Sequence, residues 1–124
     1  MKIESVADNR IIVPAEVLSK TRYFLIDTGA SVGLISHRIK GIVRGRRYEG
    51  TLTGAGGDID ALYICNTFAI LGDKRIAQFL ICDIDNIIEN IKNDEGVEIA
   101  GIISLPQMRM YGAEIDTDDN YITI

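Results

Sequence analysis

The stretch Tyr23-Phe24-Leu25-Ile26-Asp27-Thr28-Gly29-Ala30-Ser31 (YFLIDTGAS) is the most informative part of this chain. Its first four residues are all apolar, which is typical of a short buried strand that ends at a turn. Asp27 then places a carboxylate at the end of that strand, where solvent and a substrate can both reach it. Gly29 allows the backbone to turn tightly and to approach a ligand closely. The stretch predicts a carboxylate-based active site, and the plainer interpretation is a turn aspartate that caps a strand.

Three segments, in order along the chain, resemble one protein family. Tyr23–Ser36 (YFLIDTGASVGLIS) is similar to the active-site loop of the retropepsin-like aspartic proteases, the single-lobed relatives of pepsin. Gly101–Asp116 (GIISLPQMRMYGAEID) resembles the second signature of that family, in which an apolar pair and a glycine precede a short helix and a closing strand. Thr53–Gly57 (TGAGG) lies between them and resembles the glycine-rich flap. Together the segments cover most of the chain.

The resemblance implies an all-β fold: a mostly antiparallel closed barrel with one or two short helices. It also implies an aspartic endopeptidase in which Asp27 is catalytic, while Thr28, Gly29 and Ala30 support the active site. As in the family, Thr28 is expected to hydrogen-bond across a two-fold axis and to hold two copies of the loop in register. No cofactor is expected.

The number of carboxylates predicts a homodimer. Peptide hydrolysis of this kind needs one group to deprotonate water and another to protonate the substrate carbonyl. Two aspartates about 3 Å apart can do this because they share one proton, as is established for the aspartic-protease pair. This chain has one Asp-Thr-Gly, and Asp116-Thr117-Asp118 lacks the glycine that would copy the turn. The second Asp27 must therefore come from a second copy with two-fold symmetry, and the substrate is a peptide or protein.

The flap-like segment supplies the predicted substrate-binding residues Gly54, Ala55, Gly56 and Gly57. A glycine-rich hairpin tip can hinge over a bound peptide and exclude water from the reaction. The plainer interpretation is a flexible hairpin turn. Its position after the Asp-Thr-Gly favours the flap.

Two alternatives to the protease come from details of these motifs. Ser104 stands where the family usually has a glycine, and Pro106 where an acidic or amide residue is common. Both keep open a catalytically silent retropepsin-fold module for dimerisation or peptide binding. In addition, Gly29–Gly33 (GASVG) matches the G-x-S-x-G elbow of serine hydrolases, with Ser31 as nucleophile. That elbow needs a following helix and a histidine well downstream, whereas the single histidine of the chain is His37.

Length and composition limit the remaining possibilities. A chain of 124 residues with 47% hydrophobic and 25% charged residues predicts one domain, residues 1–124. The net charge of −5 argues against nucleic acid as a partner. The sequence has neither an apolar run of membrane-spanning length nor a signal peptide, so no membrane partner and a cytoplasmic location are expected.

One basic cluster runs against the overall charge: Arg38, Lys40, Arg44, Arg46 and Arg47. It predicts a solvated hairpin, with steering of an acidic substrate or partner as the alternative.

Turn signals at short intervals predict many strands. The expected strands are Lys2–Val6, Arg10–Leu18, Arg22–Ile26, Val32–Ile35, Arg47–Thr53, Ile59–Leu71, Arg75–Cys82, Val97–Ile103, Ala113–Asp116 and Tyr121–Ile124. Two helices are expected, at Asp85–Ile91 with an N-cap candidate and at Leu105–Tyr111. The last strand is expected to expose backbone groups that can pair with a partner strand.

Cys65 and Cys82 are too few for a zinc site with only one histidine to help, and they are expected to be reduced, buried and apolar in role. A two-residue hairpin loop at Asp73-Lys74 would place the cysteines opposite each other. A loop at Gly72-Asp73, which turn chemistry favours, would place Cys65 opposite Leu80.

Overall fold

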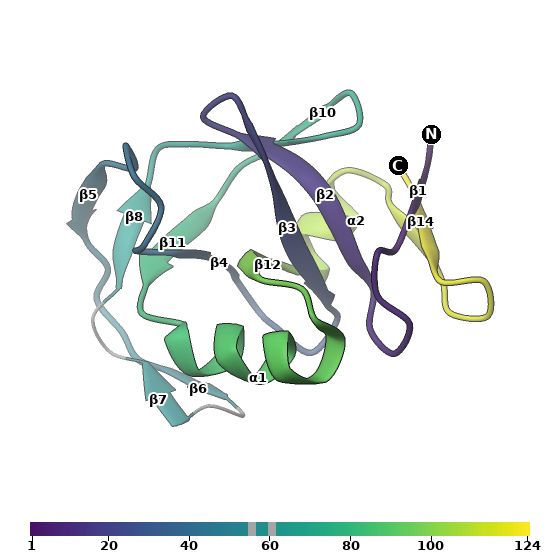
Figure 1. Cartoon of the computed structure of the whole chain (residues 1–124). Helices are drawn as coiled ribbons and strands as arrows, with labels where there is room; N and C mark the ends of the chain where they lie inside the picture. The colour runs from purple at the N-terminus through teal and green to yellow at the C-terminus, as the bar shows by residue number, and fades with distance from the viewer. Residues whose placement is uncertain (55–56, 60–61) are drawn as a thin grey trace.

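The computed structural model describes residues 1–54, 57–59 and 62–124 and is mostly β-structure (Figure 1). In these residues, one mixed sheet contains nine strands in the order β10-β9-β2-β3-β12-β4-β11-β8-β5. The strands are β2 (Ile12–Val17), β3 (Lys20–Asp27), β4 (Gly33–Ser36), β5 (Arg44–Arg47), β8 (Tyr63–Cys65), β9 (Ala69–Leu71), β10 (Lys74–Ile76), β11 (Phe79–Cys82) and β12 (Ile99–Ser104).

The large sheet is open among the described residues, so the expectation of a closed barrel is wrong. Its two edge strands are β10 and β5, and neither pairs with the other among the described residues. β10 has three residues and β5 has four, and the pairing of β5 with β8 is irregular. Short and irregular edge strands offer few hydrogen-bonding groups with which to continue a sheet. Two strand pairs, β3–β12 and β4–β11, are parallel, and the other pairs are antiparallel.

Both ends of the chain form a separate three-stranded sheet in the order β1 (Lys2–Glu4), β14 (Tyr121–Thr123) and β13 (Glu114–Asp116). It lies beside the main body, at the right of Figure 1. β14 is paired on both sides, with Ile122 fully buried opposite Ile3 and Ile115. The expectation that Tyr121–Ile124 offers a free edge is therefore wrong, because β1 and β13 already occupy its two sides.

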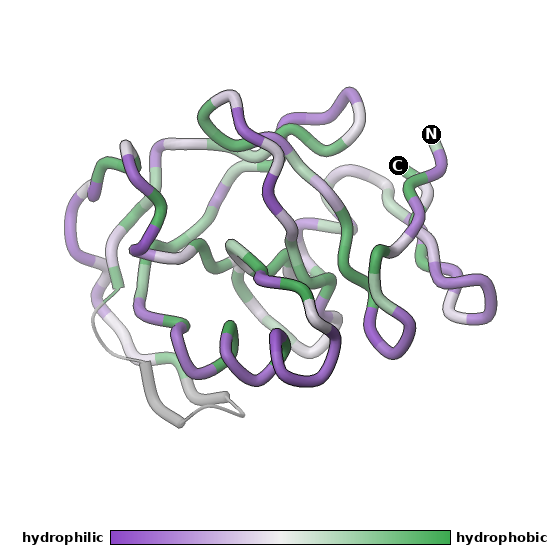
Figure 2. Tube along the Cα trace, viewed as in Figure 1, coloured by the Kyte–Doolittle hydropathy of each residue, from purple (hydrophilic) through white to green (hydrophobic). Residues whose placement is uncertain are grey.

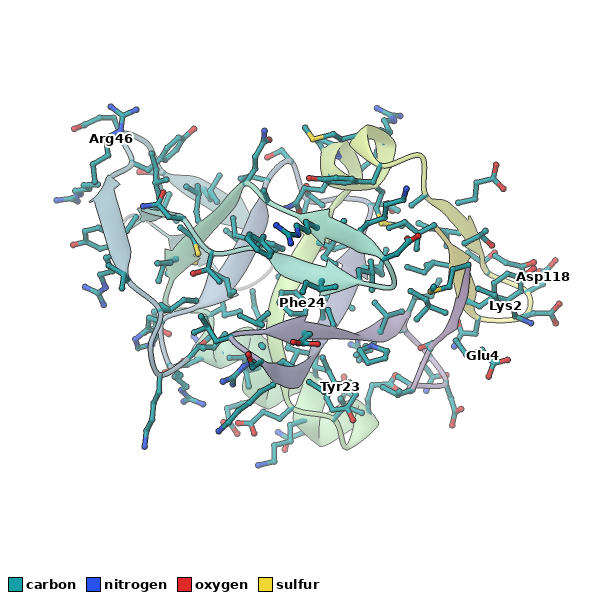
Figure 3. The ribbon with its side chains drawn as sticks, turned by 90° about the horizontal axis from the view of Figure 1, so that it is seen from above. Lys2, Glu4, Tyr23, Phe24, Arg46 and Asp118 are labelled. Carbon is teal, nitrogen blue, oxygen red and sulfur yellow. The ribbon has the colours of Figure 1, made fainter. Side chains whose placement is uncertain are left out.

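Side chains on the two faces of β3 enter two different apolar clusters. Phe24 and Ile26 are buried in the larger cluster, whereas Leu25 packs against the second cluster. Figure 3 shows Phe24 at the centre of the molecule and Tyr23 towards its surface. This alternation is expected for a strand covered on both faces.

The helix α1 (Asp85–Glu95) covers the second cluster with Ile88 and Ile91. Its apolar residues face the sheet and its polar residues face outward (Figure 2). The helix begins after Ile84, whose side chain cannot cap it, so the expected cap within Asp85–Ile91 is not formed. It ends at Gly96, whose φ of +72° favours glycine.

The second helix is α2 (Leu105–Met110), close to the expected Leu105–Tyr111. No helix in the described part of the chain combines the length and apolar character needed to span a membrane.

Several expected strands are divided into shorter ones, because residues within them do not adopt strand conformation. The expected strand Ile59–Leu71 separates into β7 (Gly57–Ile59), β8 and β9, and Arg75–Cys82 separates into β10 and β11. In the second case Gln78 has a φ of +69°, a left-handed conformation that interrupts a regular strand. Apolar runs marked these segments as β-structure but did not reveal the breaks.

The two cysteines are free and buried, as expected, and they belong to different apolar clusters. The loop at Gly72-Asp73 is confirmed, since Leu71 pairs with Lys74 in the hairpin of β9 and β10. The register of β8 and β11 is shifted from that hairpin, so Leu80 faces Ile64 rather than Cys65. The chain leaves the strands on both sides between the two pairings, at residues 66–68 and at residues 77–78.

Candidate active site

Asp27 ends β3 directly beside the end of a parallel neighbour. In the register of β3 and β12, Asp27 lies opposite Ser104, and Ile26 lies opposite Ile103. The carboxyl ends of parallel strands meet at one edge of a sheet. The loop that carries Asp27 and the helix α2 that follows Ser104 therefore start from the same edge.

The turn after β3 fixes the Asp27 carboxylate through its own backbone. The Gly29 N–H donates to Asp27 Oδ1 at 2.9 Å, and the Ala30 N–H donates to the Asp27 carbonyl oxygen at 3.1 Å. A Cβ atom at Gly29 would lie 3.3 Å from Oδ1, so glycine gives the carboxylate its room. Asp27 is half-buried, while Thr28 and Gly29 are exposed. The turn therefore orients one carboxylate oxygen and leaves the loop accessible.

Thr28 and Ala30 lie on either side of this glycine in different surroundings. The Thr28 hydroxyl makes no hydrogen bond to any residue that the structure describes. Ala30 is half-buried and packs against the second apolar cluster, together with Val32. The loop thus presents a polar side and an apolar side next to Asp27.

The flap-like segment is a hairpin, although its tip is outside the described residues. β6 (Leu52–Gly54) pairs with β7 in an antiparallel manner, and Gly54 lies opposite Gly57. The predicted residues Ala55 and Gly56 fall in the part of the chain that the structure does not describe. Leu52 packs against the same cluster as Ala30. The hairpin base and the apolar side of the Asp27 loop therefore pack against one cluster.

Ser104 and Pro106, the two departures from the family pattern, are consistent with a well-formed helix start. Ser104 is the N-cap of α2, and Pro106 occupies its first turn. The Ser104 N–H and hydroxyl donate to Gln107 Oε1 at 2.9 Å and 3.0 Å, while the Gln107 N–H donates to Ser104 Oγ. This is a capping box. The backbone behind Asp27 is therefore held by Ser104.

Gln107 supports the backbone around Ser104, a role that was not predicted from the sequence. It is 3% exposed, and its Nε2 donates to the Ala77 carbonyl oxygen at 2.7 Å. A Cβ atom at Gly33 would collide with its amide group, so Gly33 makes the room that Gln107 occupies. The S-x-x-Q spacing of Ser104 and Gln107 was the available signal.

The geometry does not favour a nucleophilic Ser31. The strand β4 follows it, whereas the elbow of serine hydrolases requires a helix. His37 lies beyond the opposite end of β4, where its Nε2 is 3.4 Å from Asp85 Oδ1 and 3.7 Å from Asp83 Oδ1. The histidine therefore belongs to the α1 side of the molecule.

His37, Asp83 and Asp85 also group ligand atoms of the kind that bind metals, all within 4.8 Å of one another. Arg38 Nε lies 2.8 Å from the same Asp85 oxygen and already supplies a positive charge there. Of the predicted basic cluster, Arg38 is thus joined to α1, whereas Arg46 lies at the end of the molecule opposite Lys2, Glu4 and Asp118 (Figure 3).

No protein-family profile and no curated protein sequence matches the chain. Solved structures do match. The EIAV protease in complex with the inhibitor HBY-793 is 20% identical, with a TM-score of 0.60, over 88% of this chain and 94% of that protein. The retroviral protease-like domain of Ddi1 from Leishmania major is 18% identical, with a TM-score of 0.61, over 94% of this chain and 89% of that domain. The chain therefore has the retropepsin-like fold.

Proposed function

We propose that this chain is an aspartic endopeptidase in which Asp27 from each of two copies forms the catalytic pair. The observation that carries the proposal is the turn at Asp27, where the Gly29 N–H orients one carboxylate oxygen on an accessible loop of a retropepsin-like fold. A turn aspartate without a catalytic role has no need of the second signature and the flap-like hairpin that accompany it here.

In the proposed mechanism, one Asp27 accepts a proton from the attacking water while the other donates a proton to the substrate carbonyl. The pair holds one proton between the two carboxyl groups, since two adjacent negative charges repel each other. Thr28 of each copy hydrogen-bonds across the two-fold axis, and its unengaged hydroxyl is suited to that role. The hairpin of β6 and β7 closes over the peptide and excludes water.

The homodimer is part of this proposal because each chain contributes half of the pair. β14 has no free edge, so terminal strands that contact a second copy would be β1 or β13. Residues 1–124 act as one domain, and the substrate is an unstructured peptide or protein segment.

The test is cleavage of an unstructured protein by the purified full chain and by Asp27→Asn. The amide keeps the size of the side chain but neither shares the proton nor acts as a base, so the rate should fall by about 10²–10⁴-fold. Asp73→Asn is a matched control, because Asp73 is exposed in the hairpin loop between β9 and β10. That variant should cleave at the parental rate.

Three other outcomes separate the alternatives. Cleavage by Asp27→Asn within a few-fold of the parent excludes the proposed mechanism. Loss of cleavage in Ser31→Ala but not in Asp27→Asn favours the serine hydrolase. A parent that dimerises or binds peptides, yet cleaves none across the acidic and neutral pH range, favours the silent module.

A further inference from the structure

A cavity of about 630 Å³ lies at the start of β3, away from the Asp27 end of the strand. Arg22 and Tyr23 line one side of it, and the segment Gly96–Ala100 between α1 and β12 lines another. Asp27 follows Arg22 by five positions along β3, which corresponds to about 16 Å. The cavity is therefore distinct from the proposed catalytic site, and its volume is typical of small-molecule sites.

Arg22 places a positive charge at this cavity that has no partner among the described residues. Its Nε atom is buried and donates to no acceptor in the described part of the chain. Its guanidinium makes no ion pair with the described residues either. Arg10, by contrast, pairs with Asp94 at 3.1 Å and Glu95 at 3.4 Å. The other N–H donors of the Arg22 guanidinium have no acceptor among the described residues either, so an acceptor that enters the cavity gains a favourable partner.

The other charges around the cavity limit the ligand to one negative charge. Arg38 also lines the cavity, but it pairs with Asp85 at 2.8 Å and with Glu89 at 3.7 Å. Glu98 is an exposed residue of the same wall and repels further negative charge. Among the described residues that line the cavity, Arg22 is thus the cation available for a ligand. A planar guanidinium suits a carboxylate because it can donate two parallel hydrogen bonds.

The rest of the lining is apolar enough to hold a hydrocarbon body. Ile88, Ile99 and Ala100 are buried, and Val97 is half-buried. We infer that this cavity binds a small monocarboxylate, with its carboxylate on Arg22 and its apolar portion against Val97 and Ile99. The carboxylate can belong to a free short-chain acid or to the C-terminus of a short peptide.

The test is titration of the full chain with hexanoate, followed through backbone amide signals in NMR spectra. Saturable shifts are expected at Arg22, Tyr23, Val97 and Ile99. Hexanamide, which has the same shape without the charge, should bind at least about 10-fold more weakly, as should inorganic phosphate. N-acetyl-leucyl-leucine and its C-terminal amide form the second pair of probes and show whether a peptide C-terminus is accepted.

Variants complete the test. Arg22→Met should weaken hexanoate binding at least about 10-fold, and Arg22→Lys less, because lysine keeps the charge without the planar pair of donors. Arg46→Met removes a distant arginine and should leave binding unchanged. Shifts that do not saturate, or equal affinities for hexanoate and hexanamide on the parent chain, would overturn the inference even if Arg22→Met did not fold.

Discussion

Gln107 Oε1 accepts hydrogen bonds from both the backbone N–H and the hydroxyl of Ser104, at 2.9 Å and 3.0 Å. The same side chain donates to the Ala77 carbonyl oxygen, so one buried amide joins the helix start behind Asp27 to the loop before β11. The support of the proposed active site therefore depends on a residue outside the Asp-Thr-Gly motif.

Gln107→Met keeps the length of this side chain and removes its polar atoms. It leaves the buried Ser104 N–H and the partly buried Ala77 carbonyl without these partners, so the free energy of unfolding should fall by about 1–3 kcal/mol. Urea denaturation measures the loss. Arg109→Met, on an exposed position of the same helix, should change stability by less than about 0.5 kcal/mol. Equal midpoints for both variants and the parent would show that Gln107 is not needed.

Ile122→Ala tests the central position of β14. Ile122 is fully buried between β1 and β13, so its truncation should lower the free energy of unfolding by about 2–5 kcal/mol. Thr123→Ala is the exposed control on the same strand. Deleting Tyr121–Ile124 should accordingly unfold the terminal sheet of each copy, as seen by loss of its slowly exchanging amides. Intact protection with a change only in oligomeric state would contradict this arrangement.

Asp116 should make the terminal sheet sensitive to acid. The hydrogen bond from the Asp119 N–H is the main cause that lowers the pKa of Asp116 from its ordinary value, with help from the Tyr121 hydroxyl, the Asp118 N–H and the charge of Lys2. A carboxylate whose folded-state pKa is lowered stabilises the fold above its unfolded pKa, and this contribution disappears as pH falls through the folded value. Stability measured below about pH 4 should therefore decline more steeply in the parent than in Asp116→Asn. Parallel curves would exclude this contribution.

Cys82 should be unreactive in the folded protein. Burial raises the pKa of its thiol to about 12, and the neighbouring charge of Asp83 adds to the effect. Because the thiolate is the reactive form, a disulfide reagent at pH 8 should modify Cys82 only as fast as the protein unfolds. The rate of modification is measured with and without urea in the variant Cys65→Ser, in which Cys82 is the remaining thiol. Rapid modification without urea would show that Cys82 is accessible.

Ala30→Ser tests the surroundings of the proposed catalytic pair, and it depends on the proposed function. Ala30 packs against apolar residues beside Asp27 and offers no hydrogen bond to a carboxylate. A hydroxyl at this position would stabilise the ionised pair, so the whole bell-shaped profile of kcat/KM against pH should move towards acid. Cleavage of one peptide is measured across pH in both proteins, with dimer content checked at each point. Superimposed profiles would show that position 30 does not set the proton affinity of the pair.

Local sequence patterns predicted most of the elements around the candidate site. The apolar run before Asp27 predicted the end of β3 correctly, and apolar residues at helical spacing predicted α1. The start of α1 at Asp85 was predicted, but its cap was not, because Ile84 occupies the cap position without a capping side chain, and the helix runs beyond the expected Ile91 to Glu95. A cap that makes no hydrogen bond leaves no signal in the sequence.

The errors had both local and long-range causes. Gln78 adopts a left-handed conformation, which glycine usually signals in a sequence, so a glutamine gave no indication of the break. Whether the sheet closes depends on the edges β10 and β5, which belong to different parts of the chain. Ser104 was interpreted only as a departure from the usual glycine, although its spacing to Gln107 is that of a capping box. That relation could have been predicted, whereas the contact of Gln107 with Ala77 could not.

The parallel pairing of β3 and β12 has a consequence for how the protein folds. The strand that ends at Asp27 lies in the first quarter of the chain, and its partner that ends at Ser104 lies in the last quarter. Pairings between distant segments form slowly, because a long loop must close before any contact compensates for its lost entropy. During synthesis, Asp27 emerges well before the strand that holds its loop in place. The Asp27 turn should thus gain its native order in one of the last folding steps, so nascent or truncated chains should lack an assembled site.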